Sequence, residues 1–391
     1  MKSWKKCAMM AAMAVMMASS AVMMTGCGKK DSGAEVKVGA CFEYTGGVAM
    51  YGQHISSGFE LAAKEVNDKG GLWGTSKVVV VKADTKSEPG ESGNAMTKLI
   101  NQEKVVAACG PATTGCVMAT APITFGAKVP QIAPSATGEA VTQMKGAVNP
   151  FMFRACFIDP FQGSVMAKFA VENKKTKNCA IFMDKSSDYA KGLAANFEKT
   201  LVAMGGKVVA NEAYLAKDVD FKAALTRLKA QNPEAIYVPG YYEEVSKIIK
   251  QARELGINVP MYGCDGWESP VLAEIAGKAA LKECFYVSAF SADDPDPSIK
   301  AFMDAFKAFK GEPADVFSQQ GYNAGKVLFA AMEKAGKGAK GVDIAKAMAA
   351  TKDLPIAGGT LTYDANHNPV MPGLIIDLSS GSAKLAAKVN M

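Results

Sequence analysis

The residues best placed to do chemistry lie in turns that follow apolar strands. Residues 109–115 read Cys-Gly-Pro-Ala-Thr-Thr-Gly and join a buried strand to the start of a helix. Backbone N–H groups and the positive end of the helix dipole at such a turn suit a carboxylate, to which the hydroxyl of Thr113 or Thr114 could donate. A simple helix cap explains the same residues equally well. The turn therefore indicates either an anion site or an ordinary helix start.

A similar turn follows the next strand of this half of the chain. Residues 133–137 read Ala-Pro-Ser-Ala-Thr. They offer hydroxyl groups at Ser135 and Thr137 and backbone polar groups at Ala136. These groups could bind the polar atoms of a small ligand.

A third turn, in the other half of the chain, adds a carboxylate. Residues 263–267 read Gly-Cys-Asp-Gly-Trp, so Asp265 lies beside the aromatic ring of Trp267 at a strand end. An acid there can pair with an ammonium group, although Asp is also common in Gly-rich turns for structural reasons. Four tyrosines in strand-to-helix turns suggest a pocket for an apolar side chain. These are Tyr51, Tyr189, Tyr241 and Tyr242.

Signatures of enzymes are scarce in the sequence. It contains no Gly-x-Ser-x-Gly elbow, no Walker loop and no His-Glu-x-x-His helix. Residues 336–341 match Gly-x-Gly-x-x-Gly, but they follow a predicted helix, so a basic surface loop is the better interpretation. Only two histidines are present, too few for most zinc sites. We therefore expect a binding protein that is not an enzyme and uses no cofactor or metal.

The composition is that of a folded protein with more than one domain. The chain has 391 residues, of which 49% are hydrophobic and 21% are charged. At about 150 residues per domain, this length predicts two or three domains. There are 44 Lys and Arg against 38 Asp and Glu, a net charge of +6. A balance this small gives no general attraction to nucleic acid.

The N-terminus has the layout of an export signal. Residues 1–26 carry three lysines, then an uninterrupted run of Ala, Met, Val and Ser, then Thr-Gly before Cys27. The run is too weakly apolar to favour a membrane helix. The tetrapeptide at 24–27 resembles a bacterial lipobox, with Met24 where Leu is usual. We expect a signal peptide at 1–26, a lipid on Cys27 and a tether at 27–34. Ordinary cleavage or retention is the alternative.

Seven cysteines remain once Cys7 and Cys27 are set aside, and in an exported protein this odd number means at least one free thiol or an intermolecular bond. We do not expect a disulfide scaffold. A bridge between Cys109 and Cys116 is conceivable. Buried, unpaired thiols are the better interpretation for most of the seven.

Strand and helix patterns alternate along the mature chain. The four valines at 78–81 predict a strand buried on both faces. Helical spacing recurs after it, for example in Val245, Ile248, Ile249 and Ala252. Alternation of this kind builds parallel sheets with helices on both faces. Near ten strands are too many for one comfortable sheet, so we expect an α/β fold of two doubly wound lobes with a ligand cleft between them.

The order of motifs resembles a known family. Residues 42–53, Phe-Glu-Tyr-Thr-Gly-Gly-Val-Ala-Met-Tyr-Gly-Gln, followed by Gly-Phe-Glu-Leu-Ala at 58–62, are similar to the opening of the leucine/isoleucine/valine-binding proteins. These are type I periplasmic binding proteins that serve ABC importers. The turns at 134–137, 188–192 and 240–241 follow in the order that the family shows.

The resemblance implies two lobes joined by three crossover segments. Carried over to this chain, one lobe comprises 35–155 and 289–361, and the other comprises 156–288 and 362–391. The lobes would close on a ligand by hinge motion and deliver it to permease subunits in the membrane. The resemblance also implies a monomer outside the cytoplasm, in the periplasm or on the cell surface. The family's small disulfide is expected to be absent, because Lys86 stands at one partner's position.

The resemblance also assigns roles to residues. Thr114, Ser135 and Thr137 match positions that bind the amino acid's carboxylate and amine. Asp265 matches an acidic position that pairs with the amine, where relatives often have Glu. The remaining matches form the pocket or its lid. The full predicted ligand-binding set is Tyr51, Thr113, Thr114, Ser135, Ala136, Thr137, Tyr189, Tyr241, Asp265, Trp267 and Phe317.

The predicted ligand is an amino acid, either branched-chain or otherwise apolar. The alternative is a protein of the same fold that binds a small amide, urea or an aromatic acid, in transport or as a sensor. The export signal weighs against a sensor, because a sensor has no need of a lipobox.

Overall fold

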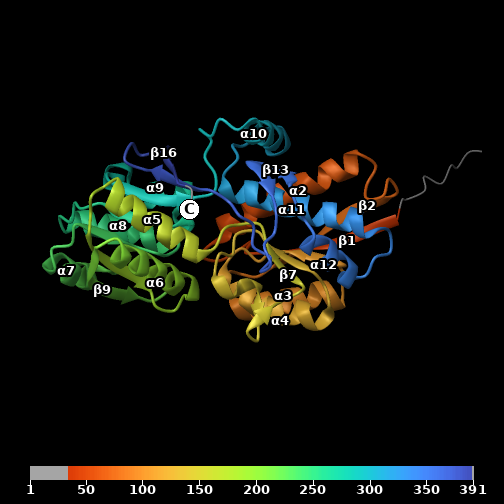
Figure 1. Cartoon of the computed structure of the whole chain (residues 1–391), viewed down its shortest axis with the longest axis horizontal. Coiled ribbons are helices and arrows are strands. Elements are labelled where there is room, and N and C mark those ends of the chain that lie inside the picture. Colours follow the sequence, from red (N-terminus) through yellow and green to blue (C-terminus); the bar gives the residue numbers. More distant parts are fainter. Residues whose placement is uncertain (1–33, 390–391) are drawn as a thin grey trace, which may run out of the picture. The chain divides into compact units, whose positions relative to one another are not determined.

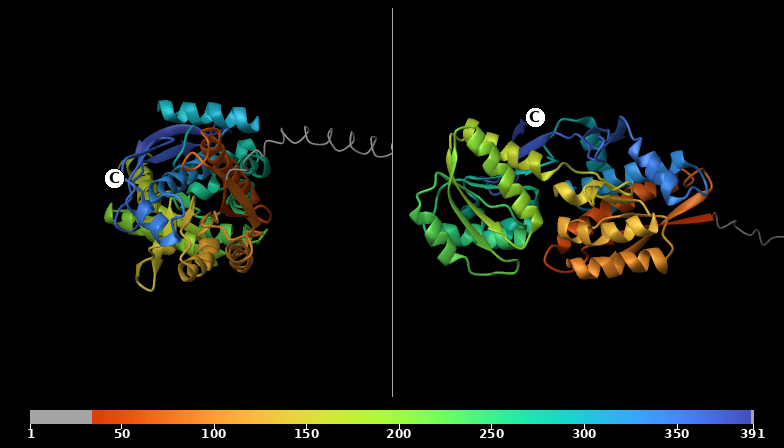
Figure 2. Two further views of the ribbon diagram at one scale, coloured as in Figure 1. Left: turned by 90° about the vertical axis from the view of Figure 1, so that its right-hand side faces the viewer. Right: turned by 60° about the horizontal axis from the view of Figure 1, so that its bottom comes forward.

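The computed structural model describes residues 34–389. The predicted signal peptide, Cys27 and all of the tether except Ala34 lie outside the described residues. Two helix-flanked sheets make up most of the described chain (Figures 1 and 2). None of the helices within residues 34–389 combines the length and the apolar character that a membrane crossing requires.

The first sheet has five strands in the order β2-β1-β3-β4-β7, and its β1–β3, β3–β4 and β4–β7 pairs are parallel. The register aligns Ala40, Cys109 and Ile132 side by side. The turns that follow β3 and β4 therefore start at one edge of the sheet, as the sequence predicts. The strands are β1 (Ala34–Phe42), β2 (Ser76–Asp84), β3 (Ala107–Cys109), β4 (Gln131–Ala133) and β7 (Met152–Arg154).

One expectation about this sheet is wrong. The valines at 78–81 were expected to be buried on both faces, yet Val79, Val80 and Val81 are only half-buried. The reason is position: β2 is an edge strand, so helices and neighbouring strands cover it less completely.

The second sheet has seven strands in the order β16-β15-β12-β11-β10-β8-β9. Its five strands from β12 to β9 pair in parallel, whereas β15 and β16 add antiparallel strands at one side. The sequence patterns did not predict these two C-terminal strands. The strands are β8 (Asn178–Asp184), β9 (Lys207–Tyr214), β10 (Ala235–Tyr237), β11 (Met261–Gly263), β12 (Cys284–Ser288), β15 (Gly373–Asp377) and β16 (Lys384–Val389).

Helices flank both sheets. With the first sheet lie α2 (Ala49–Asp68), α3 (Pro89–Asn101), α4 (Thr114–Ala127), α10 (Pro297–Lys310), α11 (Val316–Ala335) and α12 (Gly341–Ala349). With the second lie α5 (Asp159–Glu172), α6 (Asp188–Ala203), α7 (Lys222–Ala230), α8 (Tyr242–Glu254) and α9 (Pro270–Ala276). Two short hairpins, β5 (Gln143–Met144) with β6 (Ala147–Val148) and β13 (Leu354–Ile356) with β14 (Gly359–Leu361), complete the strands.

Helices α2 and α11 cross at van der Waals contact because both carry glycine at the crossing. A Cβ on Gly58 would lie 1.8 Å from the carbonyl oxygen of Ser318, and one on Gly321 would lie 2.0 Å from that of Ile55. Any larger residue would force these helices apart. This crossing fixes the N-terminus of α11 relative to α2, and both helices contribute to the site described below.

The chain passes between the two sheets three times: after β7, after β12 and before β15. The fold is therefore the predicted pair of α/β lobes with three crossovers. The third crossover is tied to β7, the strand before the first crossover, because the hydroxyl of Tyr363 donates to the carbonyl of Arg154 (2.9 Å) and the ring of His367 stacks on Phe153. The residue boundaries proposed for each lobe stay a prediction.

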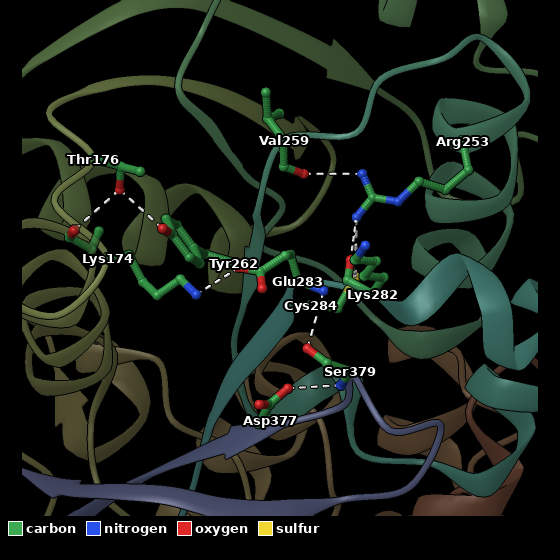
Figure 3. Close-up of polar contacts among 11 residues, drawn as sticks. Lys174, Thr176, Arg253, Val259, Tyr262, Lys282, Glu283, Cys284, Asp377 and Ser379 are labelled. Atoms are coloured by element: carbon green, nitrogen blue, oxygen red, sulfur yellow. Dashed lines mark hydrogen bonds and ion pairs between the residues drawn. The ribbon is translucent and has the colours of Figure 1, made fainter.

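At the end of the second lobe away from the site, one arginine organises the connections between elements. The guanidinium of Arg253 donates to the carbonyls of Ile257 (2.6 Å), Val259 (3.0 Å), Ala280 (3.1 Å) and Lys282 (2.8 Å). Figure 3 shows Arg253 between Val259 and Lys282. A single side chain thus joins the loop before β11 to the loop before β12.

The described cysteines are all buried with free thiols, so Cys109 and Cys116 do not form a bridge. The set is Cys41, Cys109, Cys116, Cys156, Cys179, Cys264 and Cys284. Burial raises the pKa of the Cys116 thiol to about 12, which keeps it protonated.

Candidate ligand-binding site

A small cavity lies between residues of the two lobes. Nine of the eleven predicted ligand-binding residues line it, joined by Ala112 and Gly266. The nine are Tyr51, Thr113, Thr114, Ser135, Thr137, Tyr189, Tyr241, Asp265 and Phe317.

The first wall is the start of α4, and a buried acid organises it. The carboxylate of Glu43, at the end of β1, is fully buried. It accepts hydrogen bonds from the N–H of Ala112 (2.9 Å), the N–H of Thr113 (3.1 Å) and the hydroxyl of Thr113 (3.0 Å). Burial raises the pKa of Glu43, although these hydrogen bonds oppose the shift.

This arrangement changes the interpretation of the turn at 109–115. Two of the N–H groups expected to meet a ligand carboxylate are already occupied by Glu43, and so is the Thr113 hydroxyl. Nor is the side chain of Thr113 a helix cap, since it makes no capping hydrogen bond. The turn does bind a carboxylate at the start of the helix, but the carboxylate belongs to the protein.

The second wall is the turn that follows β4. The hydroxyl of Ser135 donates to the carbonyl of Ala112 (2.7 Å), which ties this turn to the first. The guanidinium of Arg154, fully buried, donates to the carbonyls of Ala136 (3.2 Å) and Gly138 (2.9 Å). Ala136 is therefore part of the support for the turn and does not line the cavity. The hydroxyl of Thr137 is buried and has no hydrogen-bond partner among residues 34–389.

The opposite wall comes from the second lobe. The Oδ1 atom of Asp265 accepts from the hydroxyl of Tyr189 (2.5 Å) and from Nε2 of Gln162 (3.1 Å). The Asp265 N–H donates in turn to Oε1 of Gln162 (3.1 Å), so Gln162 holds both the backbone and the side chain of this acid. Burial raises the pKa of Asp265 to about 6, against the lowering effect of these hydrogen bonds.

Aromatic rings enclose the remaining sides. Tyr189 and Tyr241 stack with their ring centroids 5.1 Å apart, and Phe317 stacks on Tyr51 at 4.2 Å. Tyr51 comes from α2 and Phe317 from the first turn of α11, whereas Tyr189 and Tyr241 begin or precede helices of the second lobe. The cavity is thus an apolar enclosure with polar groups on two facing walls.

Trp267 does not line this cavity. Its side chain is 1% exposed, and its indole N–H donates to the carbonyl of Val238 (2.9 Å) in the core of the second lobe. Its ring covers Gly263, where a Cβ would come within 2.2 Å of it. The neighbour of Asp265 that does line the cavity is Gly266.

Sequence reasoning missed Glu43 and Gln162, which hold the ligand-facing residues in place. Glu43 lay inside the recognised opening motif but was not assigned a role. Gln162 lies one turn from the start of α5, and the pattern Asp-Pro-x-Gln of a helix N-terminus was its only local signal. Its partner, Asp265, is 103 residues away along the chain.

Comparison with known proteins agrees with this architecture. The family model described as periplasmic binding protein matches residues 35–383. The Leu/Ile/Val-binding protein BraC3 of Rhizobium johnstonii is 34% identical over 330 residues, covering 84% of this chain and 88% of that protein. A branched-chain amino acid transporter substrate-binding protein from Streptococcus pneumoniae, solved with isoleucine, is 35% identical with a TM-score of 0.82 and covers 91% and 98% of the two chains.

A third protein of the same fold has a different ligand. The solute-binding protein of an ABC transporter from R. palustris, solved in complex with benzoate, is 26% identical to this chain with a TM-score of 0.81. It covers 91% of this chain and 96% of its own. Two α/β lobes with a small enclosed cavity between them define a solute-binding protein. This chain belongs to the periplasmic binding protein family.

Proposed function

We propose that this protein captures an α-amino acid with an apolar side chain and delivers it to an ABC importer in the membrane. The observation that carries the proposal is the polarity of the cavity. The carboxylate of Asp265 lies in one lobe and the start of α4 in the other, with aromatic rings between them. A zwitterion with an apolar side chain complements this arrangement.

Each polar wall has a role in the proposal. The N–H of Thr114, at the first position of α4, has no partner inside the helix and would donate to the ligand's carboxylate. The hydroxyls of Ser135 and Thr137 would assist in binding the carboxylate and amine. Asp265 would bind the ammonium through Oδ2, since its hydrogen bonds to Tyr189 and Gln162 engage Oδ1.

Capture would follow from closure of the two lobes. The ligand would bind the first lobe and then gain contacts with Asp265 and Tyr189 that exist only in the closed form. Such contacts shift the equilibrium toward that form. No covalent bond changes in this process, and the protein acts as a binding protein without catalysis, cofactor or metal.

The proposal extends to the location of the protein. A lipid on Cys27 would anchor a monomer outside the cytoplasm, where it meets the permease subunits. In cells grown with a radioactive fatty acid, the protein should incorporate the label, and the Cys27→Ser variant should not. Equal labelling of the two proteins, or labelling of neither, would contradict a lipid on Cys27.

An aromatic acid is the second candidate ligand, because a structural neighbour was solved with benzoate. The cavity argues against it. No Lys or Arg is among its lining residues, whereas Asp265 is. A ligand with a carboxylate and no ammonium would bring a second negative charge into a buried site, which is unfavourable.

Isothermal titration of the chain after Cys27 tests the function. The protein is unfolded and refolded to remove carried-over ligand, then titrated with amino acids, urea, short amides and aromatic acids. We expect saturable binding of Leu, Ile or Val at roughly micromolar Kd, about −8 kcal/mol. Binding of urea, an amide or an aromatic acid alone would reject the amino-acid proposal.

A further inference from the structure

A glutamate outside the ligand cavity joins the two lobes. Glu268 comes three residues after Asp265 in the second lobe. Its Oε1 atom accepts from the N–H of Val316 (3.1 Å), the first residue of α11 in the first lobe. Its Oε2 atom accepts from the hydroxyl of Ser288 (2.7 Å), at the end of β12 in the second lobe. A single carboxyl group therefore bonds to both lobes.

Glu268 is separate from the ligand cavity, although its neighbours along the chain are not. It is absent from the residues that line the cavity. It lines a second hollow, to which both lobes contribute and which shares no lining residue with the first. Asp265 precedes Glu268 by three residues and Phe317 follows Val316 directly, and both line the ligand cavity. Glu268 thus connects two segments that each carry a cavity-lining residue, one from each lobe.

The start of α11 is held within the first lobe by other groups. Asp315, the N-cap residue, accepts from the N–H of Ser318 (2.8 Å), and the Ser318 hydroxyl accepts from the N–H of Asp315 (2.8 Å). The Oδ2 atom of Asp315 bonds to the ring of His54 on α2 (2.5 Å). The N–H of Val316 has no partner inside the helix, as is normal at a helix start. Within residues 34–389 it finds its partner, Glu268, in the other lobe.

Movement of the lobes affects the two hydrogen bonds of Glu268 differently. The bond to Ser288 lies within the second lobe, so it holds the carboxyl in place whatever the separation of the lobes. The bond to Val316 crosses between the lobes and therefore depends on that separation. The carboxyl is held ready by the first bond, and the second bond forms only when the lobes approach.

The negative charge of Glu268 is not what the contact needs. Burial raises the pKa of Glu268 to about 8, and the nearby carboxylate of Asp315 raises it as well. A group that accepts from the Val316 N–H and bonds to the Ser288 hydroxyl can be neutral. An amide of the same shape meets both requirements.

We propose that Glu268 is a positioning residue of the closed form: its carboxyl fastens the start of α11 to the turn of Asp265 and holds Phe317 and Asp265 at the spacing that encloses the ligand. This inference rests on the proposed function in one respect, the closure of the lobes on a solute. A ligand that brings the lobes together gains this bond in addition to its own contacts. Its affinity then depends on a side chain outside its cavity.

Two substitutions of Glu268 test the bond. Glu268→Ala should weaken binding of L-leucine by about fivefold or more, because it leaves the buried N–H of Val316 without an acceptor. Dissociation should be faster by a similar factor, since the bond holds the closed form. Glu268→Gln should stay within about twofold of the original protein, because the amide oxygen accepts from Val316 and the amide N–H₂ donates to Ser288. Titration calorimetry measures the affinity, and stopped-flow kinetics measures the dissociation rate.

A second pair of variants changes the donor and leaves Glu268 intact. Proline suits the first position of a helix, and Asp315 before it already has an extended backbone (φ −135°, ψ −177°), which a residue before proline favours. Val316→Pro removes the N–H and places a ring carbon toward Glu268. Val316→Ala is the matched control, because it also loses the buried side chain but keeps the N–H.

The proline variant should bind L-leucine about threefold or more weakly than the alanine variant. When Glu268→Ala is also present, Val316→Pro and Val316→Ala should bind alike, because the bond is already absent. A double-mutant cycle of this kind isolates the contact between the two residues.

Urea unfolding separates this role from a structural one. In the ligand-free protein the lobes are free to part, so the bond to Val316 contributes little to stability there. Glu268→Ala should therefore keep the unfolding midpoint of the ligand-free protein. Saturating L-leucine should raise the midpoint less in this variant than in the original protein, because the variant binds more weakly.

The outcomes are distinct. An L-leucine affinity of Glu268→Ala within about twofold of the original would overturn the proposal, and so would equal losses in Glu268→Ala and Glu268→Gln. A lower unfolding midpoint of ligand-free Glu268→Ala with an unchanged dissociation rate would assign Glu268 a structural role and overturn the proposal as well. If the original protein binds an aromatic acid and not L-leucine, the amino-acid function is rejected. Titration of the same variants with that acid then decides the role of Glu268 independently.

Discussion

The hydroxyl of Tyr51 donates a 2.5 Å hydrogen bond to the carbonyl of Gly266, and the two residues are 215 positions apart in the chain. Tyr51 lies on α2 of the first lobe, and Gly266 follows Asp265 in the second. The ring of Tyr51 also stacks on Phe317. This hydrogen bond is a direct contact between the lobes at the ligand cavity, so it should report on closure.

Tyr51→Phe should weaken ligand binding by about two- to tenfold, since a net hydrogen bond contributes about 0.5–1.5 kcal/mol. Most of the loss should come from faster dissociation, because the contact holds the closed form and the stacked ring remains. Titration calorimetry measures the loss of affinity, and stopped-flow kinetics measures the dissociation rate. Tyr44→Phe is the control, because its hydroxyl bonds to Ser56 within the first lobe. Equal dissociation rates in the two variants would count against the role in closure.

Ligand affinity should depend on pH through Asp265. Its pKa is raised to about 6 by burial, and only the ionised carboxylate pairs with an ammonium. Affinity should therefore be constant above about pH 7 and fall as the pH drops through 6, because protonation of the free protein then competes with binding. Calorimetry from pH 5 to 8 measures this. Asp265→Asn should bind at least about tenfold more weakly at pH 7 and lose most of the pH dependence. If ligand affinity in Asp265→Asn depends on pH as it does in the original protein, Asp265 is not the group that causes this dependence.

The same raised pKa has the opposite consequence for stability. The pKa of Asp265 is higher in the folded protein than its ordinary value, so folding favours the protonated carboxyl. The protonated carboxyl therefore adds to the free energy of unfolding at low pH, and this addition is lost as the pH rises from about 4 through 6. Asp265→Asn should therefore raise the free energy of unfolding of the ligand-free protein at pH 7. Urea unfolding at pH 5 and pH 7 measures it. A variant less stable than the original at pH 7 would show that the hydrogen bonds from Tyr189 and Gln162 outweigh burial.

Glu43→Gln should destabilise the start of α4. The Glu43 carboxylate accepts hydrogen bonds with both of its oxygens, whereas an amide can accept only with its single oxygen. In the variant, one of the buried donors would therefore face the amide N–H₂ group. The expected loss is about 1–3 kcal/mol in the free energy of unfolding. Ligand affinity should fall as well, because Thr113 and Thr114 line the cavity. Glu212→Gln, at an exposed pair with Arg227, should cost less than about 1 kcal/mol. Comparable losses in both variants would contradict this role of Glu43.

Arg253→Lys should lower stability and leave ligand binding unchanged. Lysine has three donors on a single nitrogen and cannot span four carbonyls that the planar guanidinium reaches together. Figure 3 shows two of the four, those of Val259 and Lys282. We expect a loss of about 2–4 kcal/mol, from carbonyls left without a donor. Urea unfolding measures the loss and calorimetry the affinity. Arg227→Lys, at the surface, is the control. A reduced ligand affinity of the folded Arg253→Lys variant would show that this end of the lobe is coupled to the site.

Much of the fold was predictable because it follows from local periodicity. The alternation of strand and helix patterns predicted two α/β lobes, and the structure has two parallel-centred sheets joined by three crossovers. The strand-end turns predicted the edge of the first sheet at which Thr114 and Ser135 lie and the edge of the second sheet at which Asp265 lies. The antiparallel strands β15 and β16 were missed. Their weak patterns become strands only by pairing with each other and with β12.

The sequence by itself determined most of the segments that form strands and helices, β15 and β16 excepted, and which turns carry polar and aromatic residues, because these depend on neighbours along the chain. Only the tertiary structure decided what each turn residue faces. Glu43 occupies the donors expected to bind a ligand, and Trp267 points into the core although it is two residues from Asp265. Burial and hydrogen-bond partners come from residues distant in sequence, and spacing along the chain does not encode them.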